Sequence, residues 1–215
     1  MAILCYKENM ENKQPKINVI IPVYNQDRLV IRAIDSVPKS EDIEVIVIDD
    51  CSTDYTLKNV RNYEIGHPQQ HIRVYHNDKN MGVGHTVNRG YDLANAEYIV
   101  LLGSDDYFYT SAFIDIMSDL DGTDLVYFNL RLNNGYIWKL NDDTKHNYCG
   151  STKFIRREFL GDTRCPELRA REDWYFYNEL LKKKPTEKFT NKVVKHYNFP
   201  RKGSLTWIAC NGFKD

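Results

Sequence analysis

The sequence lacks the features that mark membrane-spanning and nucleic-acid-binding proteins. No apolar run approaches the roughly 20 residues that a membrane-spanning helix needs. Residues 1–16 combine a short apolar run with mixed charges, which is a poor match to a signal peptide. The 29 Lys and Arg residues nearly balance the 30 Asp and Glu residues, and the net charge of −1 creates no overall field that would attract nucleic acid. We therefore expect a cytoplasmic protein with no transmembrane segment and no nucleic-acid partner.

Cysteine is scarce and shows no pairing pattern. The five cysteines are an odd number, and they are scattered along the 215 residues without a C-x-x-C pair. This pattern argues against a disulfide framework and against a zinc site, and it suits a reducing cytosol. The composition, with 42% hydrophobic and 27% charged residues, is that of a globular chain long enough for one domain with a substantial core.

Two glycine-rich nucleotide-binding motifs are absent as well. A dinucleotide-binding fold needs G-x-G-x-x-G directly after its first strand, but residues 22–27 read PVYNQD there. Gly82, Gly84 and Gly90 follow a later strand and have the wrong spacing. No G-x-x-x-x-G-K-[ST] sequence occurs, so the P-loop class is excluded too.

Short apolar strands alternate with amphipathic helices over the first half of the chain. This alternation predicts an α/β fold with a mostly parallel central sheet flanked by helices. Strands are predicted at residues 17–25, 43–50, 72–77 and 97–106, and helices within residues 27–37, 51–64 and 81–95.

The alternation loosens after residue 110. No internal repeat, low-complexity tract or linker interrupts the chain, so we expect a lead-in at residues 1–16 and one domain over residues 17–215. The predicted elements of the second half are a helix at 111–120, two strands at 124–132 and 135–140 joined by an Asn-Asn-Gly turn, a helix at 172–183 and a last strand at 191–199.

Polar groups fall at the carboxyl ends of three predicted strands, where ligands of open α/β sheets bind. These groups are Tyr24–Asn25, Asp49–Asp50 and Asp105–Asp106. Asp105 and Asp106 repel each other and need a positive partner, which can be a helix N-terminus, an arginine or a metal ion. A nucleotide diphosphate with Mg²⁺ or Mn²⁺ would satisfy the pair. A capped turn is the alternative for two adjacent aspartates taken alone.

Five motifs in the chain read, in order, INVIIPVYN, EVIVIDDCSTD, NMGVGHTVNRG, AEYIVLLGSDD and ELRAREDWYF. Together they resemble the motifs of inverting family 2 glycosyltransferases with the GT-A fold, over residues 17–207. The resemblance implies a metal-dependent enzyme that moves a sugar from a UDP-sugar donor to a hydroxyl of a glycan or glycoconjugate acceptor, in polysaccharide or cell-surface glycan synthesis. It also divides the domain into a nucleotide-binding half, residues 17–110, and an acceptor-binding half, residues 111–215.

The resemblance also implies roles for individual residues. On the donor side, Asp50 would hydrogen-bond the uracil, Asp105 would face the ribose or the metal, and Asp106 would be the direct ligand of Mn²⁺ or Mg²⁺. On the acceptor side, Asp173 would be the catalytic base, and Glu172 would help to orient the acceptor. Further donor contacts are implied for Pro22, Val23, Tyr24, Asn25, Asn80, Gly82, His85, Asn88, Ser104, Arg201 and Lys202, with Ser204 assisting.

Three positions depart from the usual pattern of that family. Gly103 stands in place of a further aspartate in the metal-binding motif, and Thr86–Val87–Asn88 replaces the common Ala-Arg-Asn. Arg201 stands where a histidine usually precedes the final serine. These departures affect the expected phosphate and metal contacts more than the class of reaction. His85 and Arg89 are candidates to replace the missing cationic contact.

Other interpretations stay open at the level of sequence. A nucleotidyltransferase shares the α/β layout and an acidic metal site, although a basic, glycine-rich loop normally follows its first strand. A catalytically silent nucleotide-sugar-binding relative is the second alternative. Taken alone, Asp173 is a helix cap, and Lys182–Lys184 is a solvated helix end or a peripheral contact with an anionic membrane. Trp138, Trp174 and Trp207 either pack in the core or stack on acceptor sugars.

Overall fold

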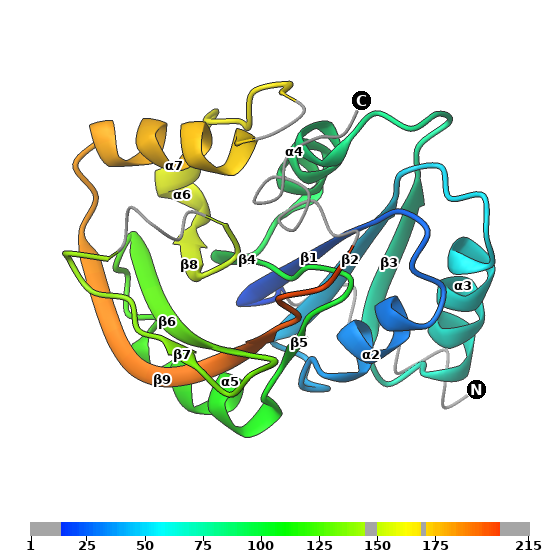
Figure 1. Cartoon of the computed structure of the whole chain (residues 1–215), viewed down its shortest axis with the longest axis horizontal. Helices are drawn as coiled ribbons and strands as arrows, with labels where there is room; N and C mark the ends of the chain where they lie inside the picture. Colours follow the sequence, from blue (N-terminus) through cyan, green and yellow to red (C-terminus); the bar gives the residue numbers. More distant parts are fainter. Residues whose placement is uncertain (1–13, 145–149, 169–170, 203–215) are drawn as a thin grey trace.

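A curled sheet of nine strands runs through the described part of the chain (Figure 1). The computed structural model describes residues 14–144, 150–168 and 171–202. Expectations for residues 1–13, Ser204 and Trp207 lie outside the described residues. The strand order is β3-β2-β1-β4-β8-β6-β9-β5, and β7 pairs with β6 away from this path.

The first half of the sheet is parallel, as the alternation of strands and helices predicts. Its strands are rich in β-branched residues and are mostly buried, as expected for a sheet with helices on both faces. The register places Ile17 beside Ile43 on one side and beside Tyr98 on the other. The strands are β1 (Ile17–Val23), β2 (Ile43–Asp49), β3 (His71–His76) and β4 (Tyr98–Leu101).

The second half of the sheet is mixed. β8 (Lys153–Arg156) lies antiparallel between β4 and β6 (Leu125–Leu132), so a late strand joins the two halves. The long β9 (Glu187–Tyr197) then pairs in parallel with β6 and curves around the edge of the fold (Figure 1). The two short strands β5 (Tyr107–Phe108) and β7 (Ile137–Trp138) pair with β9 and β6.

Helices cover both faces of the sheet and create two hydrophobic cores. Side chains alternate along β1, so Val19 and Ile21 contribute to one core while Ile20 contributes to the other. The first core contains side chains of α2 (Leu29–Asp35), α3 (Thr56–Gly66) and α5 (Thr110–Ile116), and the second contains side chains of α4 (Val83–Leu93), α6 (Arg157–Leu160) and α7 (Glu172–Lys182).

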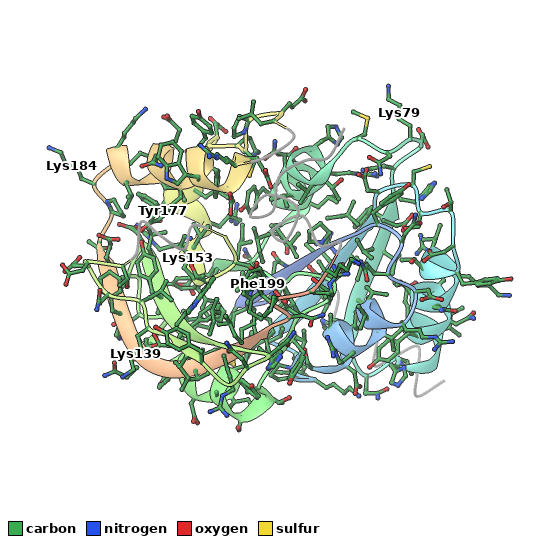
Figure 2. All side chains as sticks on the ribbon, viewed as in Figure 1. Lys79, Lys139, Lys153, Tyr177, Lys184 and Phe199 are labelled. Atoms are coloured by element: carbon green, nitrogen blue, oxygen red, sulfur yellow. The ribbon has the colours of Figure 1, made fainter. Side chains whose placement is uncertain are left out.

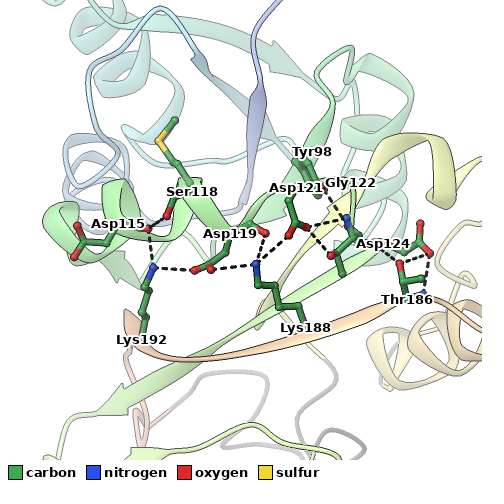
Figure 3. A network of polar contacts seen from close by, with 12 residues as sticks. Tyr98, Asp115, Ser118, Asp119, Asp121, Gly122, Asp124, Thr186, Lys188 and Lys192 are labelled. Carbon is green, nitrogen blue, oxygen red and sulfur yellow. Dashed lines mark hydrogen bonds and ion pairs between the residues drawn. The ribbon is translucent and has the colours of Figure 1, made fainter.

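A polar network fastens β9 to the short 3-10 helix η1 (Met117–Asp119) that follows α5 (Figure 3). Lys192 Nζ lies 2.8 Å from the Asp119 carboxylate, and Lys188 Nζ lies 3.2 Å from the same carboxylate and 3.1 Å from that of Asp121. The side chains of Lys188 and Lys192 point from β9 toward η1 (Figure 3). The network thereby anchors β9, and the end of this strand lines the polar cleft described below.

No helix in residues 14–144, 150–168 and 171–202 combines the length and the apolar character that crossing a membrane requires.

Candidate active site

A cleft of about 1020 Å³ opens at the carboxyl ends of β1, β2 and β4. Its opposite wall comes from β6, from the segment before β8, from the start of α7 and from the end of β9. The cleft therefore lies where polar residues follow the parallel strands, as predicted. It is lined by twelve of the residues predicted for the site: Pro22, Val23, Tyr24, Asp50, Asn80, Gly82, His85, Ser104, Asp105, Asp106, Asp173 and Arg201.

Four predicted residues are not among those that line the cleft. Two of them join neighbouring segments: Asn25 accepts a hydrogen bond from the Thr53 N–H at 2.8 Å, and Asn88 exchanges two hydrogen bonds of 2.8 Å with the backbone of Cys165. Glu172 is partly buried, and this burial raises the pKa of its carboxyl group. Lys202 is exposed.

Asp50 holds the loop that leads into α4. Its carboxylate accepts hydrogen bonds from the Asn77 amide at 2.8 Å, the Met81 N–H at 2.9 Å and the Gly82 N–H at 2.8 Å. The side chain is buried but faces the cleft. A carboxylate offers about four acceptor positions, and the described residues fill three of them, which leaves one position on Oδ2 for a ligand. The predicted contact with the uracil is compatible with this geometry and stays a prediction.

Asp105 and Asp106 have different environments although they are adjacent. Asp106 is buried, and each of its oxygens is engaged: Oδ2 lies 3.0 Å from Lys195 Nζ, and Oδ1 accepts the Asn198 N–H at 2.9 Å. Asp105 is partly exposed, and its Oδ2 accepts a hydrogen bond of 2.8 Å from Arg201 Nε. Burial and the Asp106 charge raise the pKa of the Asp105 carboxyl group, although Arg201 opposes the shift.

The positive partners of the two aspartates are thus residues of the chain. Arg201 was predicted to contact the donor diphosphate, whereas Lys195 was not predicted as a site residue. The Lys195 ammonium also donates a hydrogen bond to Ser151 Oγ, which reaches the cleft from the segment before β8. No signal in the sequence separates Lys195 from Lys192, which lies in the same predicted strand.

Gly103 gives the two carboxylates the space that they occupy. A Cβ atom at this position would lie 2.9 Å from Asp106 Oδ2 and 3.3 Å from Asp105 Oδ1. Any larger residue would push the carboxylates away from their present positions. Glycine in place of the usual aspartate therefore allows the carboxylates of Asp105 and Asp106 to lie where they do.

Asp173 lies on the other side of the cleft, in the first turn of α7. Its Oδ1 accepts a hydrogen bond of 2.8 Å from the Trp174 N–H, and its side chain is exposed to the cleft. A Cβ atom built on Gly150 would lie 3.2 Å from Asp173 Oδ2, so the segment before β8 passes directly beside this carboxylate. An exposed carboxylate with one engaged oxygen can accept a proton from a hydroxyl group in the cleft.

A buried lysine holds the segment that separates the two acidic groups. Lys153 Nζ donates to the Gly150 carbonyl at 3.2 Å and lies 4.4 Å from the centre of the Tyr177 ring, in the interior of the fold (Figure 2). Tyr177 belongs to α7, the helix that begins at Glu172. Lys153 therefore ties the Gly150–Ser151 segment to the helix that carries Asp173.

The sequence of this chain matches an established family over most of its length. Residues 18–168 match the family model described as glycosyl transferase family 2. The chain belongs to glycosyl transferase family 2. Among curated relatives, a PGL/p-HBAD biosynthesis glycosyltransferase of Mycobacterium tuberculosis is 30% identical over 179 residues, which cover 75% of this chain and 68% of that protein. The putative teichuronic acid biosynthesis glycosyltransferase TuaG of Bacillus subtilis is 27% identical over 209 residues, which cover 87% of this chain and 81% of that protein.

Solved structures confirm the GT-A type of fold for this family 2 member. The structure of S. aureus TarS residues 1–349 in complex with UDP-GlcNAc superimposes with a TM-score of 0.76 at 24% identity, covering 88% of this chain and 60% of that one. The mannosyltransferase PcManGT of Pyrobaculum calidifontis, solved with GDP-Man and Mn²⁺, gives a TM-score of 0.72 at 19% identity. The superposition covers 96% of this chain and 67% of that one. The chain thus spans about 60% of the length of the TarS fragment.

Proposed function

We propose that this protein transfers a sugar from a UDP-sugar to a hydroxyl group of a glycan or glycoconjugate acceptor, with inversion at the anomeric carbon. The observation that carries the proposal is that one cleft contains Asp50, Asp105 and Arg201 on the donor side and the exposed Asp173 on the other side. The UDP-GlcNAc complex of TarS supports a UDP-sugar donor, and the names of the curated relatives support a role in glycan synthesis.

In this proposal Asp173 removes the proton from the acceptor hydroxyl as that hydroxyl attacks the donor sugar. General base catalysis needs a carboxylate within reach of the hydroxyl and free to accept its proton. The Asp173 carboxylate meets the second condition, because only the adjacent Trp174 N–H among the described groups donates to it. Attack from this side, opposite the leaving nucleotide, produces inversion.

The donor side must stabilise the negative charge of the leaving diphosphate. Arg201 is a guanidinium group of the cleft wall and can donate to phosphate oxygens. Asn80 and Gly82 line the cleft at the loop that Asp50 holds, and Tyr24, with 43% of its surface exposed, offers a ring for the base.

No three His, Cys, Asp or Glu side chains of the described residues form a metal-binding group, so a divalent cation beside Asp105 would need the donor diphosphate to complete its ligands. Both oxygens of Asp106 are engaged by protein groups, whereas the Asp105 carboxylate is partly exposed and is paired with the partly exposed Arg201. We therefore assign the proposed Mn²⁺ or Mg²⁺ to Asp105 rather than to Asp106. A bound cation would add positive charge next to the diphosphate as it leaves. PcManGT, which was solved with Mn²⁺, supports such a cofactor.

Calorimetry with UDP in Mn²⁺ buffer, followed by a panel of UDP-sugars and GDP-mannose assayed for hydrolysis and transfer, tests the function. The Asp173→Asn variant should bind UDP as the native protein does and lose transfer, because its carboxamide cannot accept the proton. Asp54→Asn is the matched control, since Asp54 also accepts a backbone N–H at a helix start, at 2.9 Å from Thr56 N, but lies outside the cleft. Transfer that survives in Asp173→Asn, or a native protein that binds no nucleotide, would contradict the proposal.

A further inference from the structure

Two ion pairs lie side by side at the donor end of the cleft, and they differ in accessibility. The side chains of Lys195 and Asp106 are 2% and 3% exposed, and their charged atoms lie 3.0 Å apart. The side chains of Arg201 and Asp105 are 30% and 21% exposed, at 2.8 Å. All four residues line the same cleft. One pair is therefore buried, and the other is open to a ligand that enters the cleft.

The buried pair is engaged by protein groups at the ammonium and at both carboxylate oxygens. The Lys195 ammonium donates to Asp106 Oδ2 and to Ser151 Oγ, while Asp106 Oδ1 accepts the Asn198 N–H. The Asp106 N–H itself donates to the Gly103 carbonyl at 3.0 Å. Separating such a pair would leave a buried charge without compensation, so Lys195 and Asp106 stay together when the ligands change.

The open pair has few contacts. Within the described residues, Arg201 donates to Asp105 through Nε alone, although a guanidinium group carries five N–H donors. Arg32 donates to the backbone carbonyl of Asp105 and not to its carboxylate. The Asp105 carboxylate can therefore exchange its partner without any change in the backbone that carries it.

We propose that Arg201 is an exchangeable counter-ion of Asp105: a divalent cation displaces Arg201 from Asp105, and the released guanidinium binds the diphosphate of the donor. This inference rests on the proposed function, because it assumes that the cleft binds a nucleotide diphosphate and a cation. A cation that binds alone must separate the pair and leave Arg201 without an anion. When the diphosphate binds as well, Arg201 gains a new partner, so each ligand favours the binding of the other.

The reciprocity of linked binding makes this coupling measurable from either ligand. Mn²⁺ binding is followed by the loss of the free-ion electron paramagnetic resonance signal, first without nucleotide and then with saturating UDP. The variants are Arg201→Gln, which removes the counter-ion, and Arg201→Lys, which keeps a cation in its place. Arg61→Gln is the matched control, because Arg61 pairs with Glu64 at 3.3 Å on α3, outside the cleft, and its loss changes the net charge by the same amount.

Without nucleotide, Arg201→Gln should bind Mn²⁺ more tightly than the native protein, by up to about fivefold, since a partly exposed ion pair that opposes the cation has been removed. With Mn²⁺ present, the same variant should bind UDP more weakly than the native protein. The Mn²⁺ and UDP affinities of Arg201→Lys should lie between those of Arg201→Gln and those of the native protein. Arg61→Gln should match the native protein in both affinities. Far-ultraviolet circular dichroism checks that the variants are folded.

Several results would overturn the inference. Mn²⁺ affinity of Arg201→Gln that equals or falls below that of the native protein, or an absence of Mn²⁺ binding by this variant alone, contradicts the exchange. An equal gain in Mn²⁺ affinity for Arg61→Gln contradicts it too, because it indicates a general charge effect. The proposed function fails separately, by a different observation: a native protein that binds no UDP at any Mn²⁺ concentration.

Discussion

Replacing Lys195 by methionine should strongly destabilise the fold. Methionine keeps most of the length of the side chain but removes the ammonium that lies 3.0 Å from Asp106, whose side chain is only 3% exposed. Removing one partner of a buried ion pair costs about 3–5 kcal/mol, because the other charge is left uncompensated. Domains are usually stable by only about 5–15 kcal/mol. The Lys195→Met variant should therefore lose a large share of the free energy of unfolding.

The loss can be measured by urea denaturation followed by circular dichroism, and by thermal unfolding. For a chain of 150–250 residues each kcal/mol lowers the melting temperature by about 2–4 °C. We expect a decrease of about 6–20 °C, the product of these values and the cost of about 3–5 kcal/mol. The dependence of the free energy on urea should stay the same, because the variant should unfold from a native state of similar compactness.

A second variant separates the loss of the ion pair from the loss of packing. Asp106→Asn keeps an oxygen that can accept the Asn198 N–H, a hydrogen bond of 2.9 Å, but removes the charge that Lys195 balances. The double variant Lys195→Met/Asp106→Asn contains neither charge. Its free energy of unfolding should therefore fall by less than the sum of the losses in the two single variants. Additive losses, or a loss below about 1 kcal/mol for Lys195→Met, would refute the reasoning, since the pair would then act like an exposed one.

Three further predictions concern stability and reactivity. Gly90→Ala should destabilise the protein by about 1–3 kcal/mol in urea denaturation, because its Cβ would lie 2.4 Å from Ile20 Cγ2 and overpack the contact between α4 and β1; a gain from the better helix propensity of alanine would contradict this. Lys192→Met, which removes partly exposed contacts, should cost at most about 1 kcal/mol in the same assay, unlike Lys195→Met. Burial raises the pKa of the Cys165 thiol to about 12, so iodoacetamide at pH 8 should modify Cys51 faster than Cys165, as peptide mass spectrometry would show; the reverse order would count against the buried position.

The parallel half of the fold could be predicted because its signals are local. Continuous apolar runs such as residues 43–50 predict strands buried on both faces, and the structure confirms β2 at Ile43–Asp49. The helix predicted at 172–183 is confirmed as Glu172–Lys182, because its apolar residues recur at helical spacing. The predicted fold class and family membership are likewise confirmed.

The sequence did not predict how the second half of the sheet is connected. β8 has only four residues, two of them charged, so its period-2 pattern is too short to recognise, and β5 has only two. The insertion of β8 between β4 and β6 depends on contacts between residues far apart in the chain, with Ile155 beside both Ile99 and Leu125. Local periodicity contains no information about such pairings.

The candidate site shows the same limit at the level of single side chains. The need for a positive partner at Asp105–Asp106 follows from electrostatics alone, but the choice of partner depends on tertiary structure. Lys195 is 89 positions away from Asp106 and lies on a strand whose other lysines, Lys188 and Lys192, bind carboxylates near η1. Nothing in the order of these residues distinguishes the lysine that enters the cleft from the two that do not.

The two adjacent aspartates differ in exposure and in their partners, although the sequence presents them as one motif. Before any ligand binds, Lys195 and Arg201 balance the two negative charges of Asp106 and Asp105. A diphosphate alone would add uncompensated negative charge, and a divalent cation alone would add uncompensated positive charge, whereas the two together nearly cancel. Since the Lys195–Asp106 pair is buried and the Arg201–Asp105 pair is partly exposed, the proposed exchange of partners takes place at Asp105. In the proposed function, this charge balance would favour joint binding of cation and nucleotide, with the exchange at the exposed member of the motif.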